Sequence, residues 1–131
     1  RPVVIHRVIY GAIERFLALL IEHYAGAFPA WLAPQQVVVI PITERQHAYA
    51  ADVCTALSAV SFRAYRDERN EKVGYKIREA QLKKIPYMLI VGAREAKSNQ
   101  VAVRHREKGD LGPWPLDKFI AHLQQDIVEK K

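Results

Sequence analysis

Residues 69–92 read RNEKVGYKIREAQLKKIPYMLIVG, and this stretch decides the fold of the chain. It opens with a polar turn at Arg69 and Asn70 and continues as a basic helical segment, which Pro86 ends. The unbroken apolar run at 87–91 then predicts a buried strand. A basic helix that leads into a buried strand is half of an α/β unit, so we expect the functional residues in the polar loops on either side.

The segments around this stretch predict alternating strands and helices. The apolar run at 37–40 predicts a central strand buried on both faces, and Thr43 with Gln46 fits a capping box at the start of a helix. Asn70 is expected to begin the next helix, in which Gly74 marks a close approach by another backbone. The remaining expected elements are strands at 62–66, 87–91 and 100–106, a short charged loop at 92–99, a turn-rich link at 109–115 with the option of a short strand near Leu111, and a last helix at 116–127.

This order of elements predicts an α/β fold. Two strand–helix–strand crossovers imply parallel strands with helices on both faces, and the short loop after residue 91 implies that the fourth strand runs antiparallel. The result is a mixed, mostly parallel sheet of about five strands. Ligands of such sheets bind at the carboxyl ends of the parallel strands, here residues 41–43, 67–70 and 92–95. Asn70 and Glu95 are therefore expected to converge on one edge of the sheet.

The first 35 residues differ in pattern from the rest of the chain. Residues 3–9 predict a strand, and a stripe of apolar residues from Ile13 to Tyr24 predicts a helix that stops at Gly26. Residues 27–35 hold two prolines and no charge, which is typical of a linker. We therefore expect three parts: 1–26 as the C-terminal end of a larger domain, 27–35 as a linker, and 36–131 as a domain.

The charge of the chain is concentrated in one block. Of 131 residues, 20 are Lys or Arg and 14 are Asp or Glu, for a net charge of +6. Residues 63–108 hold 13 of the basic and 6 of the acidic residues, a net of +7. Such a block beside neutral flanks favours a polyanionic partner. The alternative is an ordinary, well-solvated surface.

Several kinds of site have no signature in the sequence. The five histidines show no metal-ligand spacing, and neither a Gly-rich phosphate loop nor a nucleophile motif is present, which argues against a small-molecule enzyme. Cys54 is the only cysteine and fits a reducing compartment such as the cytoplasm, as a buried small hydrophobe. The longest apolar helix is too short to cross a bilayer, so no membrane is expected.

The first residues, RPVVIHRVIYGAIERF, resemble the third signature motif of class II aminoacyl-tRNA synthetases, in the version found in the threonyl-tRNA synthetase family. The resemblance implies that Arg15 contacts ATP phosphates and that His6 is one ligand of an active-site zinc ion in the parent enzyme. Ala12 departs from the usual serine of this motif. For this chain by itself, the favoured interpretation is that Arg15 only caps or solvates its helix.

The resemblance continues through AGAFPAWLAPQQVVVIPIT at 25–43 and through residues 69–92, which are similar to the anticodon-binding domain of the same family. It implies that Asn70, Glu95 and Arg104 read the anticodon. It also places three candidate contacts to the tRNA backbone, at Lys72, Arg78 and Lys83. The alternatives are roles without any contact to tRNA: Asn70 would cap a helix, and Glu95 and Arg104 would be exposed charges.

The resemblance therefore implies that the chain is the C-terminal part of a threonyl-tRNA synthetase and binds the anticodon loop of threonine tRNA. The parent would use ATP and zinc and form a homodimer through its catalytic domain, whereas this part would hold no cofactor and be inactive alone. Two alternatives stay open. One is an α/β interaction module of the same fold that does not read tRNA, and the other is the equivalent domain of a prolyl-, glycyl- or histidyl-tRNA synthetase.

Overall fold

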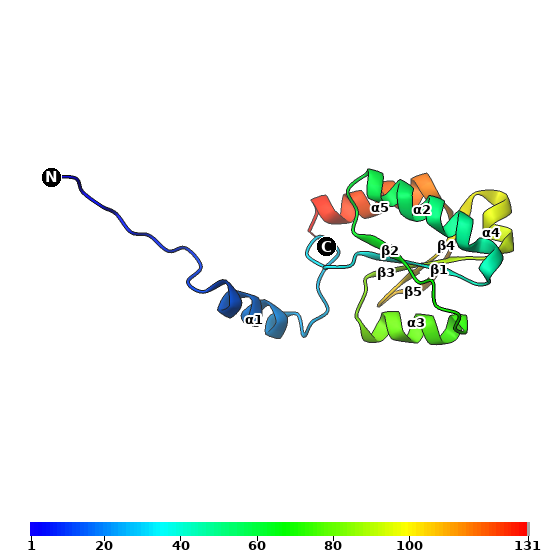
Figure 1. The fold of residues 1–131 in the computed structure, drawn as a ribbon, viewed down its shortest axis with the longest axis horizontal. Coiled ribbons are helices and arrows are strands. Elements are labelled where there is room, and N and C mark those ends of the chain that lie inside the picture. Colours follow the sequence, from blue (N-terminus) through cyan, green and yellow to red (C-terminus); the bar gives the residue numbers. More distant parts are fainter. Residues whose placement is uncertain (131) are drawn as a thin grey trace.

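The computed structural model describes residues 1–130, which form one five-stranded sheet flanked by helices (Figure 1). The strands lie in the order β2-β1-β3-β4-β5. In chain order the elements are α1 (Ile13–His23), β1 (Val37–Pro41), the 3-10 helix η1 (Glu44–Gln46), α2 (His47–Ala59), β2 (Ala64–Arg66), α3 (Val73–Leu82), β3 (Tyr87–Val91), α4 (Ala93–Ser98), β4 (Gln100–His105), β5 (Gly109–Pro115) and α5 (Leu116–Val128).

Strand pairing confirms the expected topology. β1 pairs in parallel with both β2 and β3. A crossover through α2 connects β1 to β2, and a crossover through α3 connects β2 to β3. β4 pairs antiparallel with β3, and β5 antiparallel with β4. The sheet is therefore mixed, as the short connection after residue 91 predicted.

Alternate residues of each central strand are buried on opposite faces of the sheet. Val37 and Val39 pack into a cluster with residues of α2 and α5, whereas Val38 and Ile40 pack with residues of α3. Figure 1 shows α2 and α5 on one face and α3 on the other. Because both faces are covered, β1 and β3 need apolar residues at successive positions, and this need explains their unbroken apolar runs.

The amino-terminal segment departs from the expectation. The strand predicted over residues 3–9 is wrong, since residues 1–8 form no regular structure. Val3 and Val4 are more than four-fifths exposed, and a strand forms only where a neighbour takes its hydrogen bonds. α1 is confirmed, and it ends where Gly26, at a φ of +74°, donates its N–H to the carbonyl of Ile21. α1 and the residues before it extend away from the sheet (Figure 1).

Residues 27–35 lie against the sheet and are held there by side chains of the domain. Ala30 belongs to the larger apolar core cluster, and the Gln36 side-chain amide donates to its carbonyl at 2.9 Å. Arg63 donates to the carbonyls of Ala33 and Trp31, each at 2.9 Å. Arg106 reaches the carbonyl of Phe28 at 3.0 Å. Residues 27–35 are therefore attached to the domain by these contacts, although two prolines and the absence of charge are typical of a linker.

Four local predictions need correction. Residues 92–99 contain the short helix α4 in place of a loop, and the link expected at 109–115, for which a short strand near Leu111 was an option, is the full strand β5. Gly74 has no atom near its missing side chain, so no other backbone approaches it. α3 begins at Val73 with Lys72 as its N-cap, and Asn70 therefore does not cap this helix.

Candidate nucleic-acid interface

The carboxyl ends of β1, β2 and β3 meet at the end of the sheet opposite to α1 (Figure 1). A shallow groove lies there between the loops that follow β1 and β2. It is lined by Pro41, Ile42, Thr43, Glu44, His47, Glu68, Arg69, Asn70, Glu71 and Lys76. A second hollow adjoins it and is lined by Ile42, Thr43, Glu44, Arg45, Gln46 and Ala93. The shared residues make the two hollows one continuous surface from β2 to α4.

The start of this surface is shaped by the capping box that the sequence predicted. The backbone N–H of Thr43 donates to the side-chain oxygen of Gln46 at 3.2 Å, and the Gln46 N–H donates to the Thr43 carbonyl at 3.1 Å. These bonds close the turn of η1, which leads directly into α2. The turn holds Ile42 at the surface, where this apolar side chain is 47% exposed.

Asn70 and Glu95 lie at the two ends of this surface. Asn70 is exposed and lines the groove beside β2. Glu95 lies in the first turn of α4, where its Oε2 accepts the N–H of Gly92 at 3.0 Å. A side chain on Gly92 would lie 2.7 Å from this Oε2 and 2.8 Å from Ile42 Cδ1, so the three residues are in close contact. Glu95 is thus a half-buried carboxylate whose position is fixed by its hydrogen bond with the Gly92 N–H at the start of α4.

The phenol of Tyr49 lies near Glu95. Its hydroxyl donates to the carbonyl of Gln100 at 2.8 Å. Burial raises the pKa of Tyr49, and the nearby Glu95 carboxylate raises it further. The Tyr49 hydroxyl thus stays a neutral donor beside the capped carboxylate, and it joins α2 to the start of β4.

Arg104 is set back from the edge. Its Cα pairs with Met88 of β3, three residues before the end of that strand, which places it about 10 Å from the edge. It shares the α3 face of the sheet with Met88. Its Nε is buried without a hydrogen-bond partner among the residues that the structure describes. An unsatisfied buried donor is costly, so a ligand that accepts from Arg104 would gain free energy.

The three predicted backbone-contact residues all lie along α3. Lys72 is its N-cap, Arg78 lies within it, and Lys83 is its C-cap, and all three are exposed. Lys83 also lines a hollow beside the edge strand β2 with Arg66 and Arg69. The helix therefore presents cations along the flank of the sheet that leads to the groove.

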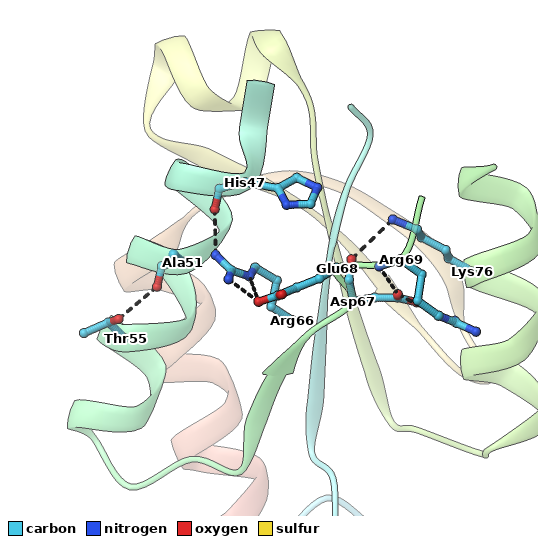
Figure 2. Close-up of polar contacts among 8 residues, drawn as sticks. All are labelled: His47, Ala51, Thr55, Arg66, Asp67, Glu68, Arg69 and Lys76. Atoms are coloured by element: carbon cyan, nitrogen blue, oxygen red, sulfur yellow. Dashed lines mark hydrogen bonds and ion pairs between the residues drawn. The ribbon is translucent and has the colours of Figure 1, made fainter. Parts of the chain in front are cut away.

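A network of charged residues at the end of β2 was not predicted from the sequence. Arg69 donates to Asp67 through Nε at 2.9 Å and Nη2 at 2.6 Å, and it also pairs with Glu79 of α3. Lys76 is only 3% exposed, and its Nζ donates to the Asp67 carbonyl at 3.2 Å (Figure 2). These contacts attach the loop after β2 to α3.

A second set of contacts holds the same loop to α2. Arg66 donates to the carbonyl of His47 at 2.9 Å and pairs with Glu68 (Figure 2). The His47 ring and the Lys76 amino group point into the same space from α2 and α3 (Figure 2). The loop before Asn70 is therefore fixed from both sides.

The buried carboxylate of Asp67 provides a test of this network. Hydrogen bonds from Arg69 hold the pKa of Asp67 below its ordinary value. Its contribution to the free energy of unfolding is therefore complete above about pH 4 and is lost as the pH falls through the folded value. We expect Asp67→Asn to cost about 1 kcal/mol at pH 7, since Arg69 is partly exposed.

Urea unfolding of both proteins between pH 2 and pH 7 measures this effect. The difference between them should shrink toward acid pH, and Glu14→Gln on the exposed α1 serves as the control. A difference that stays constant over this pH range would show that the Asp67 charge does not stabilise the loop.

The residues predicted to serve the parent enzyme are not gathered into a site. His6 and Arg15 are both exposed. Within residues 1–130, no group of three His, Cys, Asp or Glu side chains could hold a metal ion. His6 is therefore a lone imidazole among these residues, and its role as a zinc ligand in the parent enzyme stays a prediction. None of the described helices is long and apolar enough to cross a membrane.

Cys54 is half-buried against the larger core cluster, and the pKa of its thiol is raised by burial. A raised pKa keeps the thiol protonated and unreactive. The expected role as a small apolar residue is thus consistent with its surroundings.

Comparison with known families agrees with this architecture. The model of the family described as "Anticodon binding domain" matches residues 36–126. The chain therefore belongs to the anticodon binding domain family. The RNA binding domain of threonyl-tRNA synthetase from Cryptosporidium parvum Iowa II superposes with a TM-score of 0.83 at 33% identity, over 88% of this chain and 29% of that one.

The particular relatives that match along the whole chain are threonine–tRNA ligases. The protein from Acetivibrio thermocellus is 56% identical over 131 residues, which is 100% of this chain and 21% of the relative. The protein from Caldanaerobacter subterraneus subsp. tengcongensis is 58% identical over 130 residues, 99% of this chain and 20% of the relative. The chain thus spans about a fifth of the length of these relatives.

Proposed function

We propose that this chain is the part of a threonine–tRNA ligase that recognises the anticodon of threonine tRNA. The observation that carries the proposal is the similarity to threonine–tRNA ligases over the full 131 residues, together with membership of the anticodon binding domain family. The parent enzyme would ligate threonine to its tRNA with ATP, contain zinc and act as a homodimer in the cytoplasm. This part alone would be catalytically inactive.

Different residues would supply affinity and specificity. Lys72, Arg78 and Lys83 are exposed cations along α3 that would hold phosphates, which carry no sequence information. Threonine anticodons carry G at the middle position and U at the last. Glu95 offers only acceptors, which match the two donors of the guanine edge, and Arg104 offers only donors, which suit the carbonyl oxygens of uracil. Unpaired loop bases expose these edges to proteins.

The test is a titration of the chain with anticodon stem-loops of threonine tRNA and of a noncognate tRNA over a range of salt. With about four phosphate contacts, the slope of log affinity against log salt should be near −3, at roughly −0.7 for each contact on single-stranded RNA. The cognate loop should bind more tightly at every salt concentration. A flat salt response without preference would support an interaction module that does not read tRNA.

A further inference from the structure

α1 approaches the rest of the protein at its carboxyl-terminal end. None of its residues is buried, and the helix extends away from the sheet (Figure 1). The residues that follow it, 24–28, lie between two hollows of about 330 Å³ and about 170 Å³. Because hollows on both sides leave little apolar packing for this segment, its position depends on the hydrogen bonds that hold it.

Two cationic side chains make those hydrogen bonds. The Lys84 ammonium group donates to the carbonyl of Ala25, and a side chain on Gly26 would begin 3.5 Å from the same Nζ atom. Arg106 joins the two sides of this contact, since its Nη1 donates to the carbonyl of Phe28 at 3.0 Å and to that of Lys84 at 2.8 Å. The end of α1 is thereby attached to the turn between α3 and β3.

The backbone of Lys84 is in a conformation that favours glycine. Lys84 lies one residue beyond the C-cap of α3 with a φ of +58°, and its N–H donates to the carbonyl of Gln81 at 2.9 Å. Helices often end in glycine at this position, because the left-handed conformation strains other residues. Lys84 is also exposed, so core packing does not require a lysine here. Its contact with Ala25 is the feature of the structure that does.

This contact connects two helices with different expected tasks. α3 carries the three candidate phosphate contacts, and the last of them, Lys83, immediately precedes Lys84. α1 belongs to the segment predicted to be the end of another domain. A fixed connection between the helices would therefore fix the direction in which tRNA held along α3 reaches that domain, and reaction rates depend steeply on such positioning.

We propose that Lys84 is a positioning residue of the ligase: through its bond to the Ala25 carbonyl it fixes α1 relative to α3, and so fixes the bound tRNA relative to the domain that contains α1. The inference rests on the proposed function and goes beyond it, because Lys84 itself contacts neither the anticodon nor the reacting groups. Arg106 supports Lys84 by binding the carbonyl of its turn.

The first experiment measures backbone order parameters by nuclear magnetic resonance relaxation in the 131-residue chain and in its Lys84→Gly variant. Glycine adopts the left-handed conformation readily, so both proteins should unfold at a similar urea concentration. The amides of α1 should have order parameters of about 0.85 in the unmodified chain and below about 0.6 in the variant. Equal values in the two proteins, whether high or low, would overturn the proposal.

The second experiment introduces Lys84→Gly into a full-length ligase that contains this chain. The kcat for transfer of threonine to its tRNA should fall about tenfold with little change in the KM for tRNA, because the tRNA is still bound but is misplaced. Threonine-dependent exchange between ATP and pyrophosphate should be unchanged, since that reaction needs no tRNA. Lys84→Arg should restore most of the kcat, because a guanidinium group can donate to the same carbonyl.

Three results would contradict the positioning role. A raised KM with unchanged kcat would make Lys84 a phosphate contact, an equal loss in the exchange reaction would show damage to the catalytic site, and unchanged kinetics would show that the contact has no effect on the reaction. A ligase with the unmodified chain that does not charge threonine tRNA would refute the proposed function itself. The order parameters of the 131-residue chain would still test whether Lys84 holds α1.

Discussion

A chain shortened to residues 36–131 is expected to lose at least about 3 kcal/mol of its free energy of unfolding relative to the 131-residue chain. The removed segment supplies the carbonyls that Gln36, Arg63 and Arg106 bind, and each such bond contributes about 1 kcal/mol net. Ala30 would also leave the core cluster, which exposes apolar surface of the sheet. The loss should appear as a lower midpoint in urea unfolding.

A chain of residues 27–131 provides the matched control. It lacks α1 but keeps Ala30 and the four carbonyls that Gln36, Arg63 and Arg106 bind. Since α1 buries none of its residues, this chain should match the full one to within about 0.5 kcal/mol. Equal stability of all three chains would show that residues 27–35 add nothing to the free energy of unfolding, as expected of a linker.

The sheet could be predicted because its central strands are covered on both faces. β1 and β3 appear as unbroken apolar runs, and a connection too short for a crossover determines the direction of β4. The strand expected at 3–9 had a similar composition but has no pairing partner within residues 1–130. Composition shows that a segment can form a strand, whereas pairing depends on residues elsewhere in the chain.

α4 was not predicted, because the features that define it lie at its two ends and not along its length. The segment Ala93–Ser98 has no apolar stripe, and it is only six residues long. It begins with the bond between Gly92 and Glu95, and it stops at Asn99, which adopts a φ of +53°. Asn is one of the few residues that take this left-handed conformation readily. Both signals were present in the sequence, but a charged stretch between strands is also typical of a loop.

Part of the candidate site followed from topology, and part did not. Residues that follow parallel strands must reach the same edge, which is why Asn70 and Glu95 could be assigned to it. Lys76 could not, because a lysine within a basic helical segment is typical of a solvated face. Its burial depends on the loop after β2, where the Asp67 carbonyl accepts its hydrogen bond. Such tertiary contacts have no pattern in the local sequence.

Glu95→Gln is expected to lose about 1–3 kcal/mol of discrimination for G over A at the middle anticodon position, the range for a good bidentate base contact. Guanine presents two adjacent donors that both carboxylate oxygens can accept. Oε2 keeps a lone pair for this contact while it caps Gly92. Glutamine replaces one acceptor by a donor, yet its oxygen can still accept the Gly92 N–H. The fold should therefore be nearly unchanged.

The measurement is a titration of both proteins against stem-loops with G or A at the middle position. Binding to the A loop should change little or improve, because the carboxylate repels RNA when it is unpaired. Thermal unfolding of Glu95→Gln, expected to be close to that of the unmodified chain, separates recognition from stability. A full preference for G in this variant would leave Glu95 with its capping role alone.

Gly92→Ala tests the position of the Glu95 carboxylate without changing its chemistry. The added methyl group would lie 2.7 Å from Glu95 Oε2 and 2.8 Å from Ile42 Cδ1, so both side chains must move. Both atoms are at the ends of flexible side chains, and the cost in stability should stay below about 1 kcal/mol. The displaced carboxylate should nevertheless lose much of the preference for G. In the Glu95→Gln background, Gly92→Ala should reduce that preference little further, since the two changes remove the same contact. Fully additive losses would mean that Glu95 and Gly92 act independently, and the capped carboxylate would not be the group that reads the base.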